Sequence, residues 1–416
     1  MRAKCAAAMI LAWAVALLWS GAALAAAPQI LVRQPAYADD TGQVRKWRLT
    51  DSKWGFFTPL FLGLAEELDR CKHADPSAAA GLRMSPNRLD RSGVAAIAAL
   101  RDCRKGWFRK VPDGALPEKA WDRLLKDMPP PTPLDRAKVL AFGAAPLTPD
   151  YDRTIWDWDR GAGWTSADPD AILSWGPFKA TAGHGCTLQK ALAALMAQPV
   201  TAALVREHFA GETAVLDRLL DRTDPDWCAH QAAILKPVFD DPERREEFRV
   251  IFARLAAHPE IRTGYDAYFL GPTGYLAGRM ARYYGLYAQA GLTPTETDFA
   301  FFLDRSLDYP PLSETLAAQL LPLIQAAGPE TWKARRIIAN QTPFTSPGAR
   351  SFQIGRDAVY WVDAAGQAGL DPVEASSWVR NSRLKATDVG LTERPYAPPC
   401  SVVFLPACAA APGARP

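Results

Sequence analysis

A series of helical segments is the feature that most restricts the fold of this chain. Capping residues, prolines and glycines bound these segments, and their apolar residues recur every three or four positions. Within 242–256, Phe248, Phe252 and Leu255 share one helical face, which is typical of a helix packed on a core. The sequence therefore predicts a mainly α fold. Helices are expected at 54–71, 90–103, 187–197, 213–220, 226–239, 242–256, 273–289, 294–307, 312–326, 332–340 and 357–378.

One stretch departs from this helical pattern. Residues 151–185 are rich in Asp, Gly and Trp, and their apolar residues show little helical periodicity. We expect loops there around one small β-hairpin, which we place within 172–183.

Composition also suggests where the chain divides. The run 129–133 contains four prolines and is expected to form a stiff, extended connector. It separates an N-terminal helical region from a central lobe, which a second helical region and an irregular, Pro- and Ala-rich tail follow. The expected bounds of these parts are 26–131, 132–330, 331–397 and 398–416.

The first 25 residues have the features of a secretory signal peptide. Arg2 and Lys4 precede an unbroken apolar run at 6–19, and small residues follow up to Ala25. The run is too short for a membrane span, and no second run of this kind occurs later in the chain. We therefore expect cleavage near Ala25, a periplasmic or extracellular location, and a mature chain without an integral membrane segment.

Charge and motifs argue against several kinds of partner. Without Arg2 and Lys4, 46 of the 48 basic residues remain against 45 acidic ones, so nucleic acid is not an expected partner. His73, His208, His230 and His258 are scattered without the spacing of metal ligands, and no phosphate-binding loop occurs. The sequence therefore predicts neither a metal site nor a cofactor.

The cysteines fall into couples that are adjacent along the chain. Of the seven, Cys5 leaves with the leader and six remain. In an oxidising compartment an even number of cysteines favours disulfides, although buried free thiols are an alternative for one couple. The expected bonds are Cys71–Cys103, Cys186–Cys228 and Cys400–Cys408.

Carboxylates and tryptophans concentrate between 150 and 170. This stretch holds six aspartates, and Trp156, Trp158 and Trp164 lie among them. Aromatic rings beside carboxylates are typical of a sugar-binding cleft, where a ring stacks on the pyranose and the acids act on the glycosidic bond. The alternative is a solvated acidic loop whose tryptophans pack on the core.

The residues that follow carry a resemblance to a known family. Ser174-Trp175-Gly176 and Ala182-Gly183-His184-Gly185 stand where a hairpin would begin and close before a helix. Over about residues 152–310 the chain resembles the lysozyme-like superfamily, and among its members it is most similar to the chitosanases. The resemblance implies a lysozyme-like α-rich lobe in which Asp152 is the general acid, Asp168 or Asp170 the general base, and Ser174 helps to hold the attacking water. The expected substrate-binding residues are Trp156, Trp164, Trp175, Thr181 and His184.

The chain departs from that family at the acid, which is normally a glutamate. No glutamate occurs between Glu118 and Glu207. Asp152 or Asp157 could take the role, Glu66 or Glu67 could enter from another segment, or the lobe could bind sugar without cutting it. The resemblance implies a secreted glycoside hydrolase that inverts and acts on an amino-sugar polymer, chitosan or peptidoglycan. The alternative is a non-catalytic periplasmic protein that uses the lobe as a glycan-binding or scaffolding module.

Overall fold

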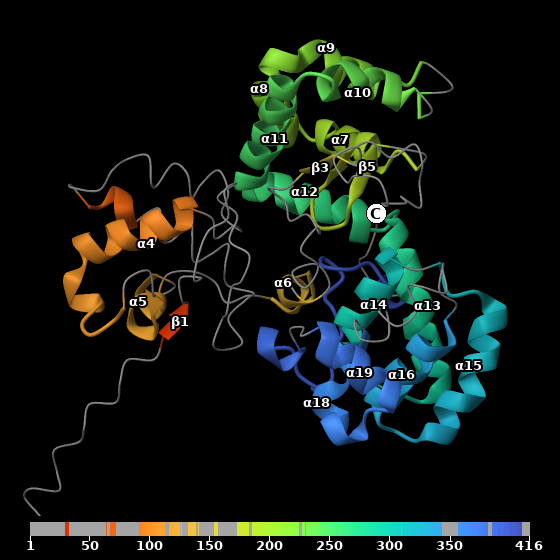
Figure 1. Cartoon of the computed structure of the whole chain (residues 1–416). Coiled ribbons are helices and arrows are strands. Elements are labelled where there is room, and N and C mark those ends of the chain that lie inside the picture. Colours follow the sequence, from red (N-terminus) through yellow and green to blue (C-terminus); the bar gives the residue numbers. More distant parts are fainter. Residues whose placement is uncertain are drawn as a thin grey trace, which may run out of the picture.

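The chain is mainly helical, as the sequence predicts (Figure 1). Besides the single predicted hairpin, the described residues contain a third strand beside it and a second, two-stranded antiparallel sheet. The structure is a computed structural model, and its description covers the following residues: 30–32, 64, 67–71, 91–112, 116–124, 126, 132–138, 140, 154–156, 173–182, 185–223, 227–228, 230–308, 310–342, 357–381 and 385–409.

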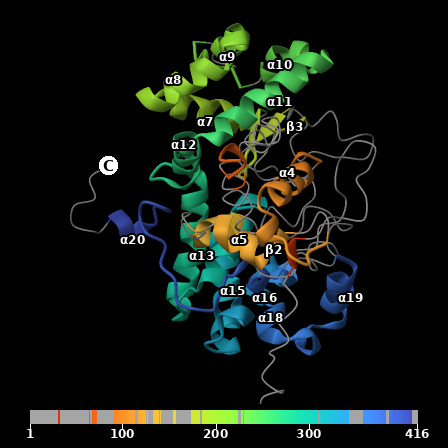
Figure 2. The ribbon, with the colours of Figure 1, turned by 90° about the vertical axis from the view of Figure 1, so that its left-hand side faces the viewer.

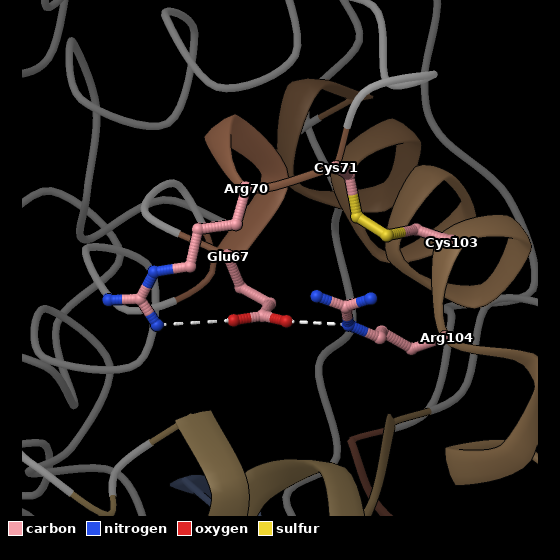
Figure 3. Close-up of a disulfide and its surroundings, with 5 residues drawn as sticks. All are labelled: Glu67, Arg70, Cys71, Cys103 and Arg104. Carbon is pink, nitrogen blue, oxygen red and sulfur yellow. Dashed lines mark hydrogen bonds and ion pairs between the residues drawn. A yellow bond between two sulfur atoms is a disulfide. The ribbon is translucent and has the colours of Figure 1, made fainter.

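The N-terminal part forms a small unit around one disulfide. Helix α4 (Arg91–Cys103) is followed by a 3₁₀ turn, η2 (Lys105–Trp107), and by helix α5 (Glu118–Leu124). Strand β1 (Ile30–Val32) pairs antiparallel with β2 (Leu116–Pro117). Cys103 ends α4 and bonds to Cys71, beside which the Glu67 carboxylate accepts hydrogen bonds from Arg70 and Arg104 (Figure 3).

A first group of long helices follows the hairpin region. Prolines open three of them, α8, α11 and α12, because a first-turn proline loses no helical hydrogen bond. At the start of α11 the Asp241 side chain also accepts from the backbone N–H groups of Glu243 and Arg244. The group comprises α7 (Thr187–Met196), α8 (Pro199–His208), α9 (Thr213–Leu220), α10 (Gln231–Phe239), α11 (Pro242–Ala257) and α12 (Pro259–Leu270), with the 3₁₀ turn η5 (Ala210–Glu212) between α8 and α9.

A second group packs below the first, with α12 between them in both views (Figure 1 and Figure 2). Its long helices are α13 (Tyr275–Ala290), α14 (Glu296–Asp308), α15 (Glu314–Ala327) and α16 (Thr331–Gln341). Helix α6 (Pro133–Lys138) packs on α14, and one hydrophobic core runs continuously through both groups. The chain then continues through η7 (Ala358–Tyr360), α18 (Val362–Ala365), η8 (Gln367–Gly369), α19 (Pro372–Asn381), η9 (Thr387–Val389) and α20 (Pro406–Ala409).

Buried ion pairs tie the second group together. Arg335 of α16 contacts Asp298 of α14 at 2.7 Å, and both side chains are fully buried. Tyr287 donates to the same carboxylate at 2.9 Å, so this buried charge is hydrogen-bonded as well as paired. Arg305 and Asp357 form a second buried pair at 3.0 Å.

The structure differs from the predicted helices at α8, at α12, at 357–378 and in the tail. Helices α8 and α12 were not predicted, and they begin at Pro199 and Pro259, a short distance after the helices that precede them. The single helix expected at 357–378 is instead several short ones, since Gly366 adopts a left-handed φ of 68° and ends α18. The tail expected to be irregular contains α20.

The cysteines pair as predicted. The Cα atoms are 6.1 Å apart in Cys71–Cys103, 5.4 Å in Cys186–Cys228 and 5.6 Å in Cys400–Cys408. These separations lie within the usual range for a disulfide.

No helix of the described segments is by itself long and apolar enough to cross a membrane. Helices α7 and α8 meet that criterion only as a pair, and they are bent by 118° relative to each other.

Candidate functional site

The predicted hairpin lies where the sequence places it. Strands β4 (Leu173–Trp175) and β5 (Ala180–Ala182) pair antiparallel and are joined by the turn Gly176 to Lys179. Gly176 and Lys179 have φ values of 74° and 52°, and Lys179 N–H donates to the Gly176 carbonyl at 3.1 Å. The left-handed position favours glycine at the start of this turn.

The two faces of the hairpin differ in polarity. Leu173, Trp175, Ala180 and Ala182 have no exposed surface and belong to the core. Ser174 and Thr181 are cross-strand partners, so they share the other face. Two of the predicted site residues are therefore brought together by the register of the hairpin.

The hydroxyl groups of this face have defined donor and acceptor roles. Thr181 Oγ1 donates to the Lys179 carbonyl at 2.7 Å and lies 3.1 Å from Ser174 Oγ. Because a hydroxyl has one proton, Ser174 must be the donor in the contact with Thr181. Ser174 is only 5% exposed, and no described residue donates to its Oγ, so its lone pairs could accept from the proton of a water or a sugar hydroxyl.

Helix α7, which follows the hairpin, is hydrogen-bonded to it. Thr181 N–H donates to Thr187 Oγ1 at 2.7 Å, and Thr187 Oγ1 contacts the Thr181 carbonyl at 3.3 Å. Thr187 is the first residue of α7, so the start of α7 and the polar face of the hairpin are held in fixed relation.

Tyr265 of α12 fixes the turn from the core side. Its hydroxyl donates to the Trp175 carbonyl at 2.9 Å and accepts from the N–H groups of Phe178 and Ala180 at 3.2 and 3.4 Å. Burial raises the pKa of Tyr265 well above its ordinary value, so the hydroxyl stays protonated and can donate. Sequence reasoning missed this role, because the partners are up to 90 residues apart.

An ion pair supports the same turn. Lys138 Nζ of α6 lies 2.6 Å from Asp266 Oδ2 of α12 and 5.6 Å from the centre of the Phe178 ring. The Lys138 side chain is only 9% exposed, so this pair is shielded from solvent more than most surface pairs. No motif in the sequence indicated it.

A third strand completes the sheet beside the hairpin. Strand β3 (Thr154–Trp156) pairs antiparallel with β4, and Trp156 is the partner of Leu173. Trp156 thus belongs to the sheet of the candidate site, although its side chain is outside the description. The other predicted site residues, Asp152, Trp164, Asp168, Asp170 and His184, lie outside the described residues.

Trp175 does not fit its predicted role in substrate binding. Its ring is fully buried and lies 4.9 Å from the rings of Phe252 and Tyr265. A ring with no exposed surface cannot stack on a sugar, so we assign Trp175 to the core.

Glu67, one of the alternative acids, is engaged elsewhere. Its carboxylate accepts from Arg104 Nε at 2.6 Å and from Arg70 Nη1 at 3.4 Å, beside the Cys71–Cys103 disulfide (Figure 3). These two contacts place the Glu67 carboxylate in the N-terminal unit, where it supports the disulfide region. Glu66 lies outside the described residues.

A disulfide lies at the start of α7. Cys186 caps this helix in a left-handed conformation and is bonded to Cys228, and Gln231 Nε2 donates to its sulfur at 2.8 Å. Across the described ranges no group of three or more His, Cys, Asp or Glu side chains is placed to hold a metal ion.

Comparisons with known proteins identify no relative. No family model matches the chain, and neither the curated proteins nor the solved structures give a match.

Proposed function

We propose that this chain is an exported glycoside hydrolase that cleaves an amino-sugar polymer with inversion. The observation that carries the proposal is the hydroxyl face of the β4–β5 hairpin. Ser174 Oγ lies 3.1 Å from Thr181 Oγ1 near the start of α7, and Ser174 is only 5% exposed. No described residue donates a hydrogen bond to Ser174 Oγ. An inverting hydrolase needs such an acceptor, because a water bound through its proton keeps a lone pair for attack on the anomeric carbon.

The proposed catalytic carboxylates are close in sequence to strands of the same sheet. Asp168 and Asp170 come shortly before Leu173, the first residue of β4. Asp157 follows Trp156 directly in the chain, and Trp156 pairs with Leu173. Covalent connectivity therefore joins Asp157 to the end of the sheet where β4 begins, whereas Asp152 precedes β3 at the opposite end.

In this mechanism one carboxylic acid protonates the leaving glycosidic oxygen while a carboxylate deprotonates the water on the other face of the sugar. Asp168 or Asp170 is the proposed base, with Ser174 accepting the second proton of the water as a hydrogen bond. Asp152 or Asp157 is the proposed acid. Because Asp157 follows the strand end that lies beside the start of β4, Asp157 is a stronger candidate for the general acid than the sequence alone suggested.

Export is part of the proposal. The leader features at 1–25 support it, as do the three disulfides, since such bonds persist in oxidising compartments. A test of the location is amino-terminal sequencing of protein recovered from the periplasm or medium. A new terminus close to Ala26 would support the proposal, and an intact Met1 in recovered protein would contradict it.

The experiment for catalysis measures reducing ends released from chitosan and from peptidoglycan. The wild type is compared with Asp152→Asn, Asp157→Asn, Asp168→Asn and Asp170→Asn. We expect the acid variant to lose activity on the polymer but to keep it on an aryl glycoside, whose leaving group needs no protonation. The base variant should lose activity on both substrates.

Ser174→Ala provides a further readout, because it removes the acceptor but no charge. We expect kcat to fall while KM stays close to that of the wild type, since the water is positioned for the reaction and not for sugar binding. If the wild type releases no reducing ends from either polymer, the proposal of hydrolysis is wrong.

The second candidate is a non-catalytic glycan-binding protein. One observation favours it. Of the two glutamates considered as alternative acids, Glu66 and Glu67, the structure describes Glu67, and its carboxylate is hydrogen-bonded to Arg70 and Arg104. Retention of the wild type on an insoluble polymer, without any released reducing ends, would favour this candidate.

A further inference from the structure

A strongly basic surface lies on the N-terminal unit. Residues 101–126 contain eight basic and four acidic residues, a net charge of +4, while the whole 416-residue chain carries only +3. This short stretch is therefore locally basic within a chain whose total charge is close to neutral. Such an asymmetry favours an anionic partner more strongly than the near-neutral total charge indicates.

The structure gathers these charges around Trp107. The guanidinium carbon of Arg123 lies 5.3 Å from the centre of the Trp107 ring, and that of Arg104 lies 6.0 Å from it. The aromatic ring attracts both cations and so holds two guanidinium groups near each other, although they repel. We call this region the Trp107 surface; it consists of the half-buried Trp107 and of the exposed Lys105, Arg109, Lys110, Lys119 and Arg123.

Most cations of the Trp107 surface are free to bind a partner. Lys105, Arg109 and Lys110 are exposed and form no ion pair within the described part of the chain. Arg104 is not counted in this surface, because its Nε donates to the Glu67 carboxylate at 2.6 Å (Figure 3). Glu67 and the Cys71–Cys103 disulfide thereby fix the position of the surface without neutralising the lysines.

We propose that the Trp107 surface binds an amino-sugar polymer that carries carboxylates, with peptidoglycan as the substrate class rather than chitosan. This inference rests on the proposed function and chooses between its two polymers. Guanidinium groups bind carboxylates through paired hydrogen bonds, and exposed lysines add attraction over a Debye length of about 8 Å at physiological salt. Chitosan carries protonated amines in mildly acidic solution, so a cationic surface repels it.

Phosphate-bearing polymers would meet the same charges, but the carboxylate polymer fits better. The proposed export takes the chain away from nucleic acids. Trp107, the tryptophan whose side chain is described in this surface, is already engaged by two guanidinium groups, whereas proteins that bind single strands use free rings on which successive bases stack.

The test is co-sedimentation of the full chain with insoluble peptidoglycan, with chitosan beads as the comparison. Double-stranded DNA and anionic vesicles are further arms. The charge-reversal variant and its control change the net charge equally, and circular dichroism checks that both fold. The variant is Lys105→Glu/Arg109→Glu/Lys110→Glu, and the control is Arg206→Glu/Arg218→Glu/Arg394→Glu, at three exposed positions elsewhere.

We expect the wild type and the control to sediment with peptidoglycan, and raised salt to weaken this binding. The charge-reversal variant should show an apparent Kd about tenfold higher or more, because three attractive charges become repulsive. Equal binding by variant and wild type would overturn the proposal. An equal loss in the control, a preference for chitosan, or equally tight binding to DNA or vesicles would also overturn it.

A parallel assay on soluble oligosaccharides separates this inference from the proposed function. If the wild type sediments with peptidoglycan but cleaves no oligosaccharide, hydrolysis fails and the binding surface stands. If the charge-reversal variant cleaves oligosaccharides like the wild type but does not sediment with the polymer, both proposals are supported.

Discussion

At the scale of single residues, Gly176 and Tyr265 show how closely the hairpin turn is packed. A Cβ atom built on Gly176 would lie 2.6 Å from Cζ of Tyr265, and Gly176 has a left-handed φ of 74°. The glycine therefore meets both a conformational and a steric requirement. Tyr265 in turn satisfies three backbone groups of the hairpin with one hydroxyl.

Gly176→Ala should be much more destabilising than a glycine replacement of the same backbone conformation. Gly291 has the same φ of 74° but no atom within 4 Å of a built Cβ, so Gly291→Ala measures the conformational cost alone. We expect Gly291→Ala to lower the free energy of unfolding by about 1 kcal/mol. Gly176→Ala should lower it by roughly 1–3 kcal/mol more, because the added methyl group overpacks the turn. Urea denaturation measures both. Equal losses would show that the Tyr265 ring moves aside without cost.

Tyr265→Phe should lower the free energy of unfolding by about 1–3 kcal/mol, because the buried Trp175 carbonyl loses its donor and two N–H groups lose their acceptor. Tyr268→Phe is the matched control, since Tyr268 lies on the same helix and its hydroxyl makes no hydrogen bond in the described structure. Thermal and urea unfolding of both variants test the difference. If Tyr265→Phe loses no more stability than Tyr268→Phe, the three hydrogen bonds of the Tyr265 hydroxyl do not stabilise the hairpin turn.

At the scale of elements, local signals predicted those helices whose ends the sequence marks. The bounds predicted for α9 match the structure, and the hairpin lies within the predicted range. Helices α8 and α12 were not predicted, and Pro199 and Pro259 begin them after very short connections from the preceding helices. The supports of the candidate site, Tyr265 and the Lys138–Asp266 pair, could not be predicted, because they depend on contacts between distant segments.

The connection between α8 and α12 is expected to make stability sensitive to pH. His208, the last residue of α8, lies 2.8 Å from His258, Nε2 to Nε2, and His258 caps α12. Burial and the neighbouring His258 lower the pKa of His208 below 6.5, although Glu207 opposes this and Arg254 adds to it. The unfolded state then binds more protons than the folded state, so stability falls as the pH drops through 6.5.

His208→Gln should therefore reduce the loss of stability between about pH 8 and about pH 5. Urea denaturation at both pH values gives the difference for each protein. His230→Gln, at an exposed position outside this pair, is the control and should retain the loss of the wild type. The same loss in all three proteins would contradict a role for the His208–His258 contact.

At the scale of the whole molecule, the C-terminal segment 390–408 connects the two helix groups. Backbone hydrogen bonds join Thr392 and Arg394 to the start of α14, and Phe404 N–H donates to the Leu270 carbonyl at the end of α12. Glu393 reaches the buried Arg335 at 2.6 Å. The segment thus contacts both α12, which supports the hairpin, and the buried ion pair of the second group.

Removal of this segment should destabilise the whole helical lobe and not only the chain end. Leu391, Val403 and Leu405 are buried in the common core, and burial of each such side chain contributes about 1.5–3 kcal/mol. A chain that lacks residues 390–416 should therefore unfold at a clearly lower temperature, whereas loss of 410–416 removes no described residue and serves as the control.

Calorimetry measures both truncated chains, and Val403→Ala covers the case in which the longer deletion does not fold. We expect Val403→Ala to cost about 2 kcal/mol, because it leaves a cavity in the core. Val402→Ala, at a partly exposed neighbour, should cost clearly less. If the two truncated chains melt at the same temperature as the full chain, the segment 390–408 does not contribute to holding the two helix groups together.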